Sequence, residues 1–147
     1  MSTAPALTAD AIERARQWVA ERGRTTPARV RVLAHLLQAG RALTHAELEA
    51  GLARAGGLDR VTLYRVLDWL VQQGLAHRIA GEDRVWRFSA VDSGAGGHDH
   101  AHFRCDDCGR VYCLDSLRPV VALTLPAGFR CREAELTLHG LCPQCGA

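Results

Sequence analysis

HDHAHFRCDDC, residues 98–108, is the stretch that decides how the C-terminal part of this 147-residue chain folds. Its histidines occupy alternate positions: His98, His100 and His102. Alternate side chains of an extended segment point to the same side, so these imidazoles can converge on one point. Cys105 and Cys108 follow with the Cys-x-x-Cys spacing of a metal-binding knuckle. We therefore expect metal ions to organise the fold around this stretch.

A second knuckle, CPQC at residues 142–145, lies almost at the C-terminus. Together the two knuckles supply four thiolates: Cys105, Cys108, Cys142 and Cys145. A tetrahedral sulfur cage selects Zn2+, and a closed four-ligand site is structural. The segment between the knuckles has room for a helix and a strand, so the metal would fasten the end of the domain to its beginning. The alternative is disulfides or a redox Cys-x-x-Cys, which a cytoplasmic location disfavours.

The histidines are left for a second, regulatory metal site. Its candidate ligands are His77, His98, His100, His102 and Cys113. His77 stands at the start of a predicted hairpin in the N-terminal half, so a metal that it shares with the later histidines would fix two domains in one orientation. Cys113 could equally be a buried apolar residue, and Cys131 is expected to pack within a strand. Three other histidines are expected to be ordinary polar residues: His35, His45 and His139.

Start signals ahead of this stretch predict four helices. Capping boxes open the first and third helices, at Asp10-Ala-Ile-Glu13 and Thr44-His-Ala-Glu47. Thr26-Pro27 opens the second, and Asp59 opens the fourth, which runs to about Gln73. Glycines that follow each apolar pattern end the helices.

The fourth helix has two different faces. Its apolar stripe consists of Leu63, Val66, Leu67 and Leu70. At 100° per residue, Arg65 points nearly opposite that stripe, with Thr62 and Tyr64 on its flanks. Such a helix can enter the major groove of DNA, although a solvated helix surface explains the pattern equally well when the helix is taken alone.

Two short predicted strands follow, Ala76–Ile79 and Arg84–Phe88, joined by a turn at residues 80–83. The predicted elements have the order of a winged helix-turn-helix: three helices with a turn, then a fourth helix and a hairpin. This order favours the recognition-helix interpretation over a merely solvated surface.

A Gly-rich linker at residues 89–97 separates this half from the rest. The elements expected after it are strands at Phe103–Cys105 and Arg110–Leu114, a short helix from Asp115 or Ser116 through Leu123, and a strand at Phe129–Leu138. The fold class is therefore α+β, with a winged-helix domain over residues 1–90 and a small α/β domain with the four-cysteine site over residues 91–147.

The composition excludes several classes of protein. Apolar residues make up 48% of the chain, enough for a core. No apolar run approaches the ~18 residues that span a bilayer, and the N-terminus lacks a signal-peptide pattern, so we expect a cytoplasmic protein without membrane contact. Residues 1–90 hold 13 Arg against 9 acidic residues, whereas residues 91–147 hold 5 Arg against 7. With no Ser/His/Asp set and no Gly-rich phosphate loop, we expect no enzyme.

Three motifs resemble the ferric uptake regulator (Fur) superfamily, over the chain from about residue 10 to Cys145. They are TPAR at 26–29 followed by Val32-Leu33, RVTLYRVL at 60–67, and HAHFRCDDCG at 100–109. The resemblance implies a homodimeric, metal-responsive transcriptional regulator with a winged helix and a C-terminal α/β dimerisation domain. It also implies that the four knuckle cysteines hold a structural zinc ion.

The same resemblance implies a set of DNA contacts. Tyr64 and Arg65 would contact DNA from the recognition helix, and we include their neighbours Arg60 and Thr62 in the candidate interface. An N-terminal arginine, Arg22 or Arg24, would approach the minor groove; we assign Arg24 to the interface. These assignments predict double-stranded DNA as the partner.

The regulatory site departs from the iron-sensing pattern of the superfamily. Ala42 stands where those members place a His before the third helix, and Arg87 is the residue nearest to their Glu at the end of the wing. Cys113 replaces their acidic residue after the second knuckle cysteine, and Ala134 stands at the position of a further helper ligand.

The zinc-sensing branch (Zur) is a closer match. His77 and His98 match its wing His and its His before the first knuckle. Its wing Cys would fall near Phe88 and is missing, but Cys113 could supply the thiolate. A thiolate among imidazoles favours Zn2+ over Fe2+ or Mn2+, so we expect one structural and one regulatory Zn2+ per chain.

The expected function is a zinc-responsive transcriptional repressor that binds a palindromic operator as a homodimer and controls metal-uptake genes. One alternative is a regulator of the same family that responds to iron, manganese, nickel or peroxide. The other is a metal chaperone without a DNA role, which would have no need of the helical N-terminal half.

Overall fold

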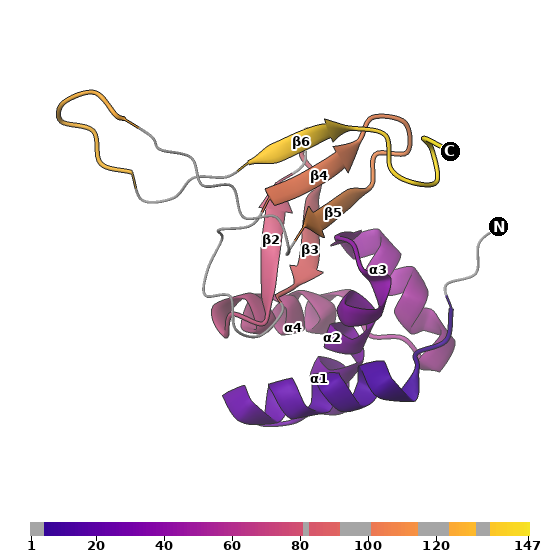
Figure 1. The fold of residues 1–147 in the computed structure, drawn as a ribbon. Helices are drawn as coiled ribbons and strands as arrows, with labels where there is room; N and C mark the ends of the chain where they lie inside the picture. The colour runs from indigo at the N-terminus through magenta and orange to yellow at the C-terminus, as the bar shows by residue number, and fades with distance from the viewer. Residues whose placement is uncertain (1–4, 81–82, 92–100, 115–123, 132–135) are drawn as a thin grey trace. The chain divides into compact units, whose positions relative to one another are not determined.

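The computed structural model describes residues 5–80, 83–91, 101–114, 124–131 and 136–147. The chain forms two compact units, Met1–Val91 and Asp92–Ala147 (Figure 1). Among the described residues, every helix is too short or too polar to cross a lipid bilayer.

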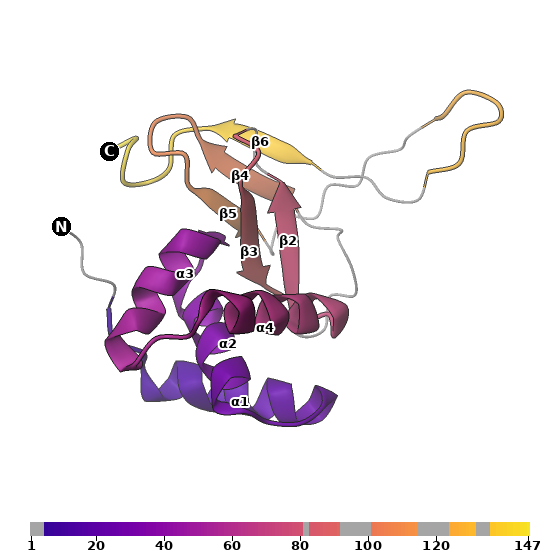
Figure 2. The ribbon, with the colours of Figure 1, turned by 180° about the vertical axis from the view of Figure 1, so that it is seen from behind.

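The first unit has the element order of a winged helix-turn-helix. Its helices are α1 (Ala9–Arg22), α2 (Pro27–Ala39), α3 (His45–Leu52), the 3-10 turn η1 (Ala53–Ala55) and α4 (Arg60–Gln72). Its strands are β1 (Leu43–Thr44), β2 (Ala76–Ala80) and β3 (Trp86–Ala90), in the sheet order β1-β3-β2. Figure 2 shows α4 in the foreground, on the outer side of the helix group. The predicted helices and hairpin are confirmed.

Side-chain caps set where the helices begin. Thr26, Thr44 and Asp59 cap α2, α3 and α4, as the sequence predicts. The predicted cap of α1 at Asp10 is wrong, because the backbone is already helical there. Thr8 is the cap, and its Oγ1 accepts a hydrogen bond from the Ala11 N–H at 3.1 Å. Asp10 instead lies in the first turn, where its negative charge interacts favourably with the positive end of the helix dipole and stabilises α1.

The helices bury their apolar stripes in one core with the sheet. Its largest fully buried side chains in this unit are Val19, Val32, Leu33, Leu36, Leu48, Leu52, Leu63, Leu67 and Leu70. Phe88 of β3 joins them, whereas Ile12 of α1 is only partly buried. Full burial of one Leu stabilises the fold by roughly 1.5–3 kcal/mol. The core therefore fixes α4 with its polar face outward.

The wing hairpin is antiparallel, with Ala76 opposite Ala90 and Ala80 opposite Trp86. The predicted start of β3 at Arg84 is two residues too early. Arg84 has φ 61°, a left-handed conformation that belongs to a turn and not to a strand. The two-residue strand β1, which pairs with β3, was not predicted, because so short a strand leaves no alternation in the sequence.

The second unit contains a sheet with the order β5-β4-β6. Its strands are β4 (Ala101–Cys105), β5 (Val111–Leu114) and β6 (Thr137–Gly140). β5 is antiparallel to β4, and β6 is parallel to β4. The predicted strand at Phe129–Leu138 is wrong in its bounds, because residues 129–131 are not in a strand and β6 begins only at Thr137. The short helix predicted up to Leu123 lies outside the described residues.

Candidate metal centre and nucleic-acid interface

The topology of the second unit brings the two cysteine knuckles together. Because β6 runs parallel to β4, both strands end at the same edge of the sheet, where Cys105 lies opposite Gly140. The chain that leaves β6 therefore arrives beside the first knuckle. The sulfur atoms of four cysteines all lie within 4.8 Å of one another: Cys105, Cys108, Cys142 and Cys145. The predicted convergence of these four residues is thus present, with Cys105 and Cys142 buried.

Backbone turns shape each knuckle. The Gly109 N–H donates to the Cys105 carbonyl at 2.9 Å, and Gly109 has φ 73°, a conformation that a side chain would strain. In the second knuckle the Gly146 N–H donates to the Cys142 carbonyl at 2.8 Å. The Cys142 N–H also donates to the Cys105 sulfur at 3.4 Å, so the two knuckles are joined directly.

The cysteine thiols of this cluster do not titrate alike. Backbone N–H groups, first that of Cys108 and then that of Cys142, lower the pKa of the Cys105 thiol to about 6. The pKa of Cys142 is lowered as well, chiefly by a backbone hydrogen bond from Cys145. The pKa of Cys145 is raised, chiefly because its thiol is hydrogen-bonded to Cys142 and also because burial desolvates it. Four sulfurs this close cannot all ionise without a cation, so the donor set fits a Zn2+ ion.

The candidate regulatory ligands fall in both units. In the second unit, His102 of β4 and Cys113 of β5 are direct register partners. In the first unit, His77 lies on β2 opposite Ser89 and is buried. His98 and His100 lie outside the described residues. Among the described members, the structure therefore brings His102 and Cys113 together within one sheet.

Cys131, by contrast, was wrongly expected to pack within a strand. It is exposed, and residues 129–131 are not in a strand.

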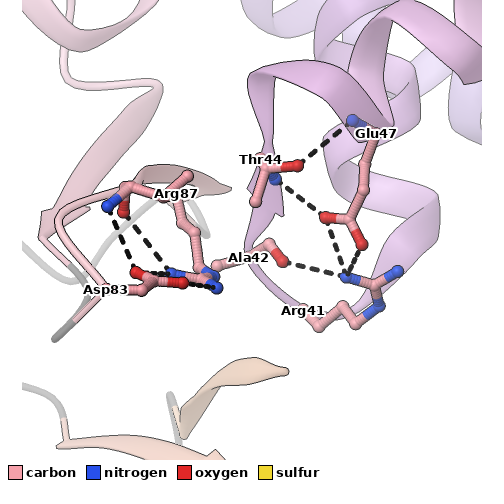
Figure 3. Close-up of polar contacts among 7 residues, drawn as sticks. Arg41, Ala42, Thr44, Glu47, Asp83 and Arg87 are labelled. Atoms are coloured by element: carbon pink, nitrogen blue, oxygen red, sulfur yellow. Dashed lines mark hydrogen bonds and ion pairs between the residues drawn. The ribbon is translucent and has the colours of Figure 1, made fainter. Parts of the chain in front are cut away.

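The surroundings of Ala42 contain no metal-ligand geometry among the described residues of the first unit. The Arg41 guanidinium donates to the Ala42 carbonyl at 3.1 Å and pairs with Glu47 at 3.1 Å (Figure 3). Glu47 is also the third residue of α3, and its carboxylate accepts a hydrogen bond from the Thr44 N–H at 2.8 Å in the capping box. The carboxylate is therefore occupied by the helix start and by an arginine.

Arg87 forms an ion pair inside the wing. Its guanidinium donates to both carboxylate oxygens of Asp83, at 3.0 and 2.9 Å (Figure 3). The side chain of Arg87 is only 10% exposed. Its pKa is raised, first by the hydrogen bonds to Asp83 and also by the charges of Asp83 and Glu47. A cation thus stands where the iron-sensing pattern has an acidic ligand.

The outer face of α4 carries the predicted DNA contacts. Arg60, Tyr64 and Arg65 are exposed, and half of the Tyr64 side chain is open to solvent. Val61 is 58% exposed on the same helix, an apolar residue that the prediction did not include. Thr62 differs from the others, because its backbone N–H and its hydroxyl both donate to the capping carboxylate of Asp59.

The segment between α1 and α2 places Arg24 on the surface. The Arg29 guanidinium donates to the Arg24 carbonyl at 2.6 Å and lies over the Trp69 ring at 3.8 Å from its centroid. Trp69 belongs to α4, so this contact ties the Arg24 segment to that helix.

His45 was wrongly expected to be an ordinary polar residue. Its ring is stacked on Tyr64, with centroids 4.0 Å apart and planes 21° apart. The two residues belong to different helices, so no spacing rule in the sequence could have indicated the contact.

Comparisons with known proteins agree with this arrangement. The chain matches the ferric uptake regulator family over residues 21–139. It is 33% identical to the transcriptional regulator FurA of Mycobacterium tuberculosis (strain ATCC 25618 / H37Rv) over 134 residues, which cover 86% of this chain and 88% of FurA.

The zinc uptake regulation protein of Escherichia coli (strain K12) is 32% identical over 87 residues, which cover 57% of this chain and only half of that protein's length. A solved structure of a zinc uptake regulator complexed with zinc and DNA shares the fold, with a TM-score of 0.67 at 24% identity and coverage of 93% of both chains. The chain therefore belongs to the ferric uptake regulator family.

Proposed function

We propose that the protein is a metal-dependent, DNA-binding transcriptional repressor that responds to zinc and controls metal-uptake genes. The observation that carries the proposal is the outer face of α4, where Arg60, Tyr64 and Arg65 are exposed on a helix whose opposite side is locked in the core. Arginines of such a helix can bind phosphates and guanine edges in the major groove. The protein would act in the cytoplasm as a homodimer on a palindromic operator.

The two units divide the work in this proposal. Residues 1–90 form the DNA-binding domain, and residues 91–147 form the dimerisation and metal-binding domain. The solved zinc- and DNA-bound relative supports this division, because this chain shares its fold over 93% of its length.

In the second domain, the four knuckle cysteines would hold a structural Zn2+. The ion would neutralise the clustered thiolates and close the end of the sheet, and it would take no part in sensing. The buried sulfurs and the lowered pKa of Cys105 support this role.

We further propose that a second Zn2+ regulates DNA binding through ligands drawn from His77, His98, His100, His102 and Cys113. The register pair His102–Cys113 supports the inclusion of a thiolate. Ala42 and the ion-paired Arg87 offer no ligand of the iron-sensing kind, which supports zinc over iron. Binding of the metal would stabilise the DNA-competent state, and its loss would release the operator.

Substitution of Arg65 tests the DNA-binding role. The probe is the duplex that the zinc-loaded protein enriches most strongly from a random-sequence pool. Arg65→Ala should weaken its binding about five-fold or more, because an arginine contact to a base edge contributes about 1–3 kcal/mol. The exposed Arg130, in the second unit, provides a control of equal charge, and Arg130→Ala should bind normally.

The same experiment separates the alternatives. If no duplex is enriched while zinc is still held tightly, the protein is a metal chaperone and the repressor proposal is wrong. If Fe2+ or Mn2+ supports binding and Zn2+ does not, DNA binding stands and the choice of metal is wrong.

A further inference from the structure

His45 and Tyr64 form the only stacked ring pair among the described residues. His45 is the first residue of α3, and Tyr64 lies on the exposed face of α4. The imidazole is mostly covered, with 16% of its side chain exposed, whereas Tyr64 is 50% exposed. One ring is therefore held by the scaffold, while the other lies on the surface that we propose for DNA.

The position of His45 is fixed from several sides. The capping box of Thr44 and Glu47 holds the backbone at the start of α3. His45 Nδ1 lies 3.9 Å from the Glu49 carboxylate. Its Nε2 is buried and has no hydrogen-bond partner in the described part of the chain. The face of the ring, in contrast, contacts the ring of Tyr64.

The same carboxylate also restrains the recognition helix. Glu49 Oε1 accepts a hydrogen bond from Arg60 Nε at 3.3 Å. His45 and Glu49 of α3 thus contact two residues of the candidate DNA interface, Tyr64 and Arg60. Among these contacts, the ring stack is the one that sets the orientation of an otherwise exposed aromatic side chain.

We propose that His45 is a positioning residue for sequence recognition, which holds the Tyr64 ring in the orientation needed to contact the operator. This inference rests on the proposed function. An exposed tyrosine that is free to change rotamer must lose that freedom when it binds, and a ring already stacked in place does not. The effect concerns base recognition, because phosphate contacts position a protein without reading sequence.

The test compares His45→Ala with His45→Phe, which keeps a flat ring over Tyr64. The probes are the pool-selected duplex and a scrambled duplex of the same composition, both with zinc-loaded protein. His45→Ala should weaken binding to the selected duplex about 5- to 10-fold, or about 1 kcal/mol, and leave binding to the scrambled duplex unchanged. The salt dependence of binding should also stay the same, since no phosphate contact is lost. His45→Phe should restore affinity to within about two-fold of wild type.

A double-mutant cycle separates positioning from direct contact. In a Tyr64→Ala background, His45→Ala should have no further effect, because its only role is to orient the missing ring. His139→Ala removes an exposed histidine of the second unit and serves as the control.

Three results would overturn the inference: unchanged operator affinity in His45→Ala, equal losses on both duplexes with a lowered melting temperature, or no rescue by Phe. If the wild-type protein selects no duplex at all, the proposed function itself fails, which is a different outcome.

Discussion

At the scale of single residues, His35 is the histidine of the first unit for which we expect a pH-dependent effect on stability. Its ring lies where a Cβ on Gly51 of α3 would approach to 3.2 Å, so the imidazole packs closely against α3. Burial lowers the pKa of His35 below its ordinary value of 6.5, and the nearby charge of Arg31 lowers it further. The folded chain therefore takes up a proton on His35 less readily than the unfolded chain.

His35 should consequently destabilise the fold in acid. Because the unfolded chain binds this proton more readily, the free energy of unfolding decreases as the pH falls through the unfolded-state pKa of about 6.5. Above that pH the histidine is neutral in both states and has no such effect. His35→Gln cannot be charged and should show a smaller loss of unfolding free energy between pH 7.5 and pH 5.5. Urea unfolding of zinc-loaded protein at both pH values measures the difference. An identical loss in the variant and the wild type would contradict this assignment.

Local chemistry made some residues predictable and left others out of reach. Thr26, Thr44 and Asp59 were found as caps because capping depends on a few neighbouring residues. The role of His45 depends on a contact across 19 positions in the chain, to Tyr64. Side-chain identity alone also could not show that Cys131 is exposed.

At the scale of elements, the wing depends on the ion pair between Asp83 and Arg87. Asp83 accepts from the Val85 N–H at 3.1 Å as well as from Arg87, so it holds both the turn and the start of β3. Arg87 pairs in register with Thr44 of β1, which is also the cap of α3. The wing and the start of α3 are thus parts of one small sheet.

Removal of Asp83 should therefore cost more than removal of the whole pair. Asp83→Ala leaves a nearly buried guanidinium without its carboxylate, and we expect a loss of about 1–2 kcal/mol, reduced by the partial exposure of Asp83. Adding Arg87→Met should recover part of the loss, since an apolar side chain can replace the charge. Thermal unfolding of the first unit measures both values. A double variant less stable than Asp83→Ala would contradict the explanation.

Element types were more predictable than their bounds. Periodicity and caps gave the four helices, because apolar spacing reports which face is buried. The predicted start of β3 at Arg84 is wrong, because Arg84 takes a left-handed turn conformation. The strand β1 was not predicted, because two residues are too few to leave a pattern in the sequence. The strand predicted from Phe129 is wrong in its bounds, because residues 129–131 are not in a strand and β6 begins at Thr137.

At the scale of the whole molecule, the two units differ in what holds them together. The first has a large core of Leu and Val side chains. In the described part of the second, the buried apolar residues are Ala101, Cys105, Val111 and Cys142. With so little apolar burial, we expect metal coordination to supply much of the folding free energy of the second unit. The convergence of the four cysteines was predictable from the sequence, because each Cys-x-x-Cys pair has the spacing of a metal-binding knuckle.

Loss of the structural metal should unfold the second unit alone. Cys108→Ser should lower the zinc content and dimer stability, while the helical circular dichroism of the first unit persists. The matched control is Cys131→Ser, which changes a cysteine outside the cluster and should retain wild-type zinc. A Cys108→Ser protein with full zinc content and an unchanged melting profile would show that the four-sulfur cluster is not the structural site.

In the function that we propose, a regulatory zinc ion, distinct from the structural one, controls DNA binding. The most direct measurement is a Zn2+ titration of protein that retains only its structural zinc, followed by the anisotropy of the selected duplex. We expect DNA binding to rise with one further Zn2+ per chain, and we expect Cys113→Ser to need at least ten-fold more Zn2+ to reach the same binding. DNA binding that is already complete before the second Zn2+ is added, or that requires Fe2+ and ignores Cys113→Ser, would contradict it.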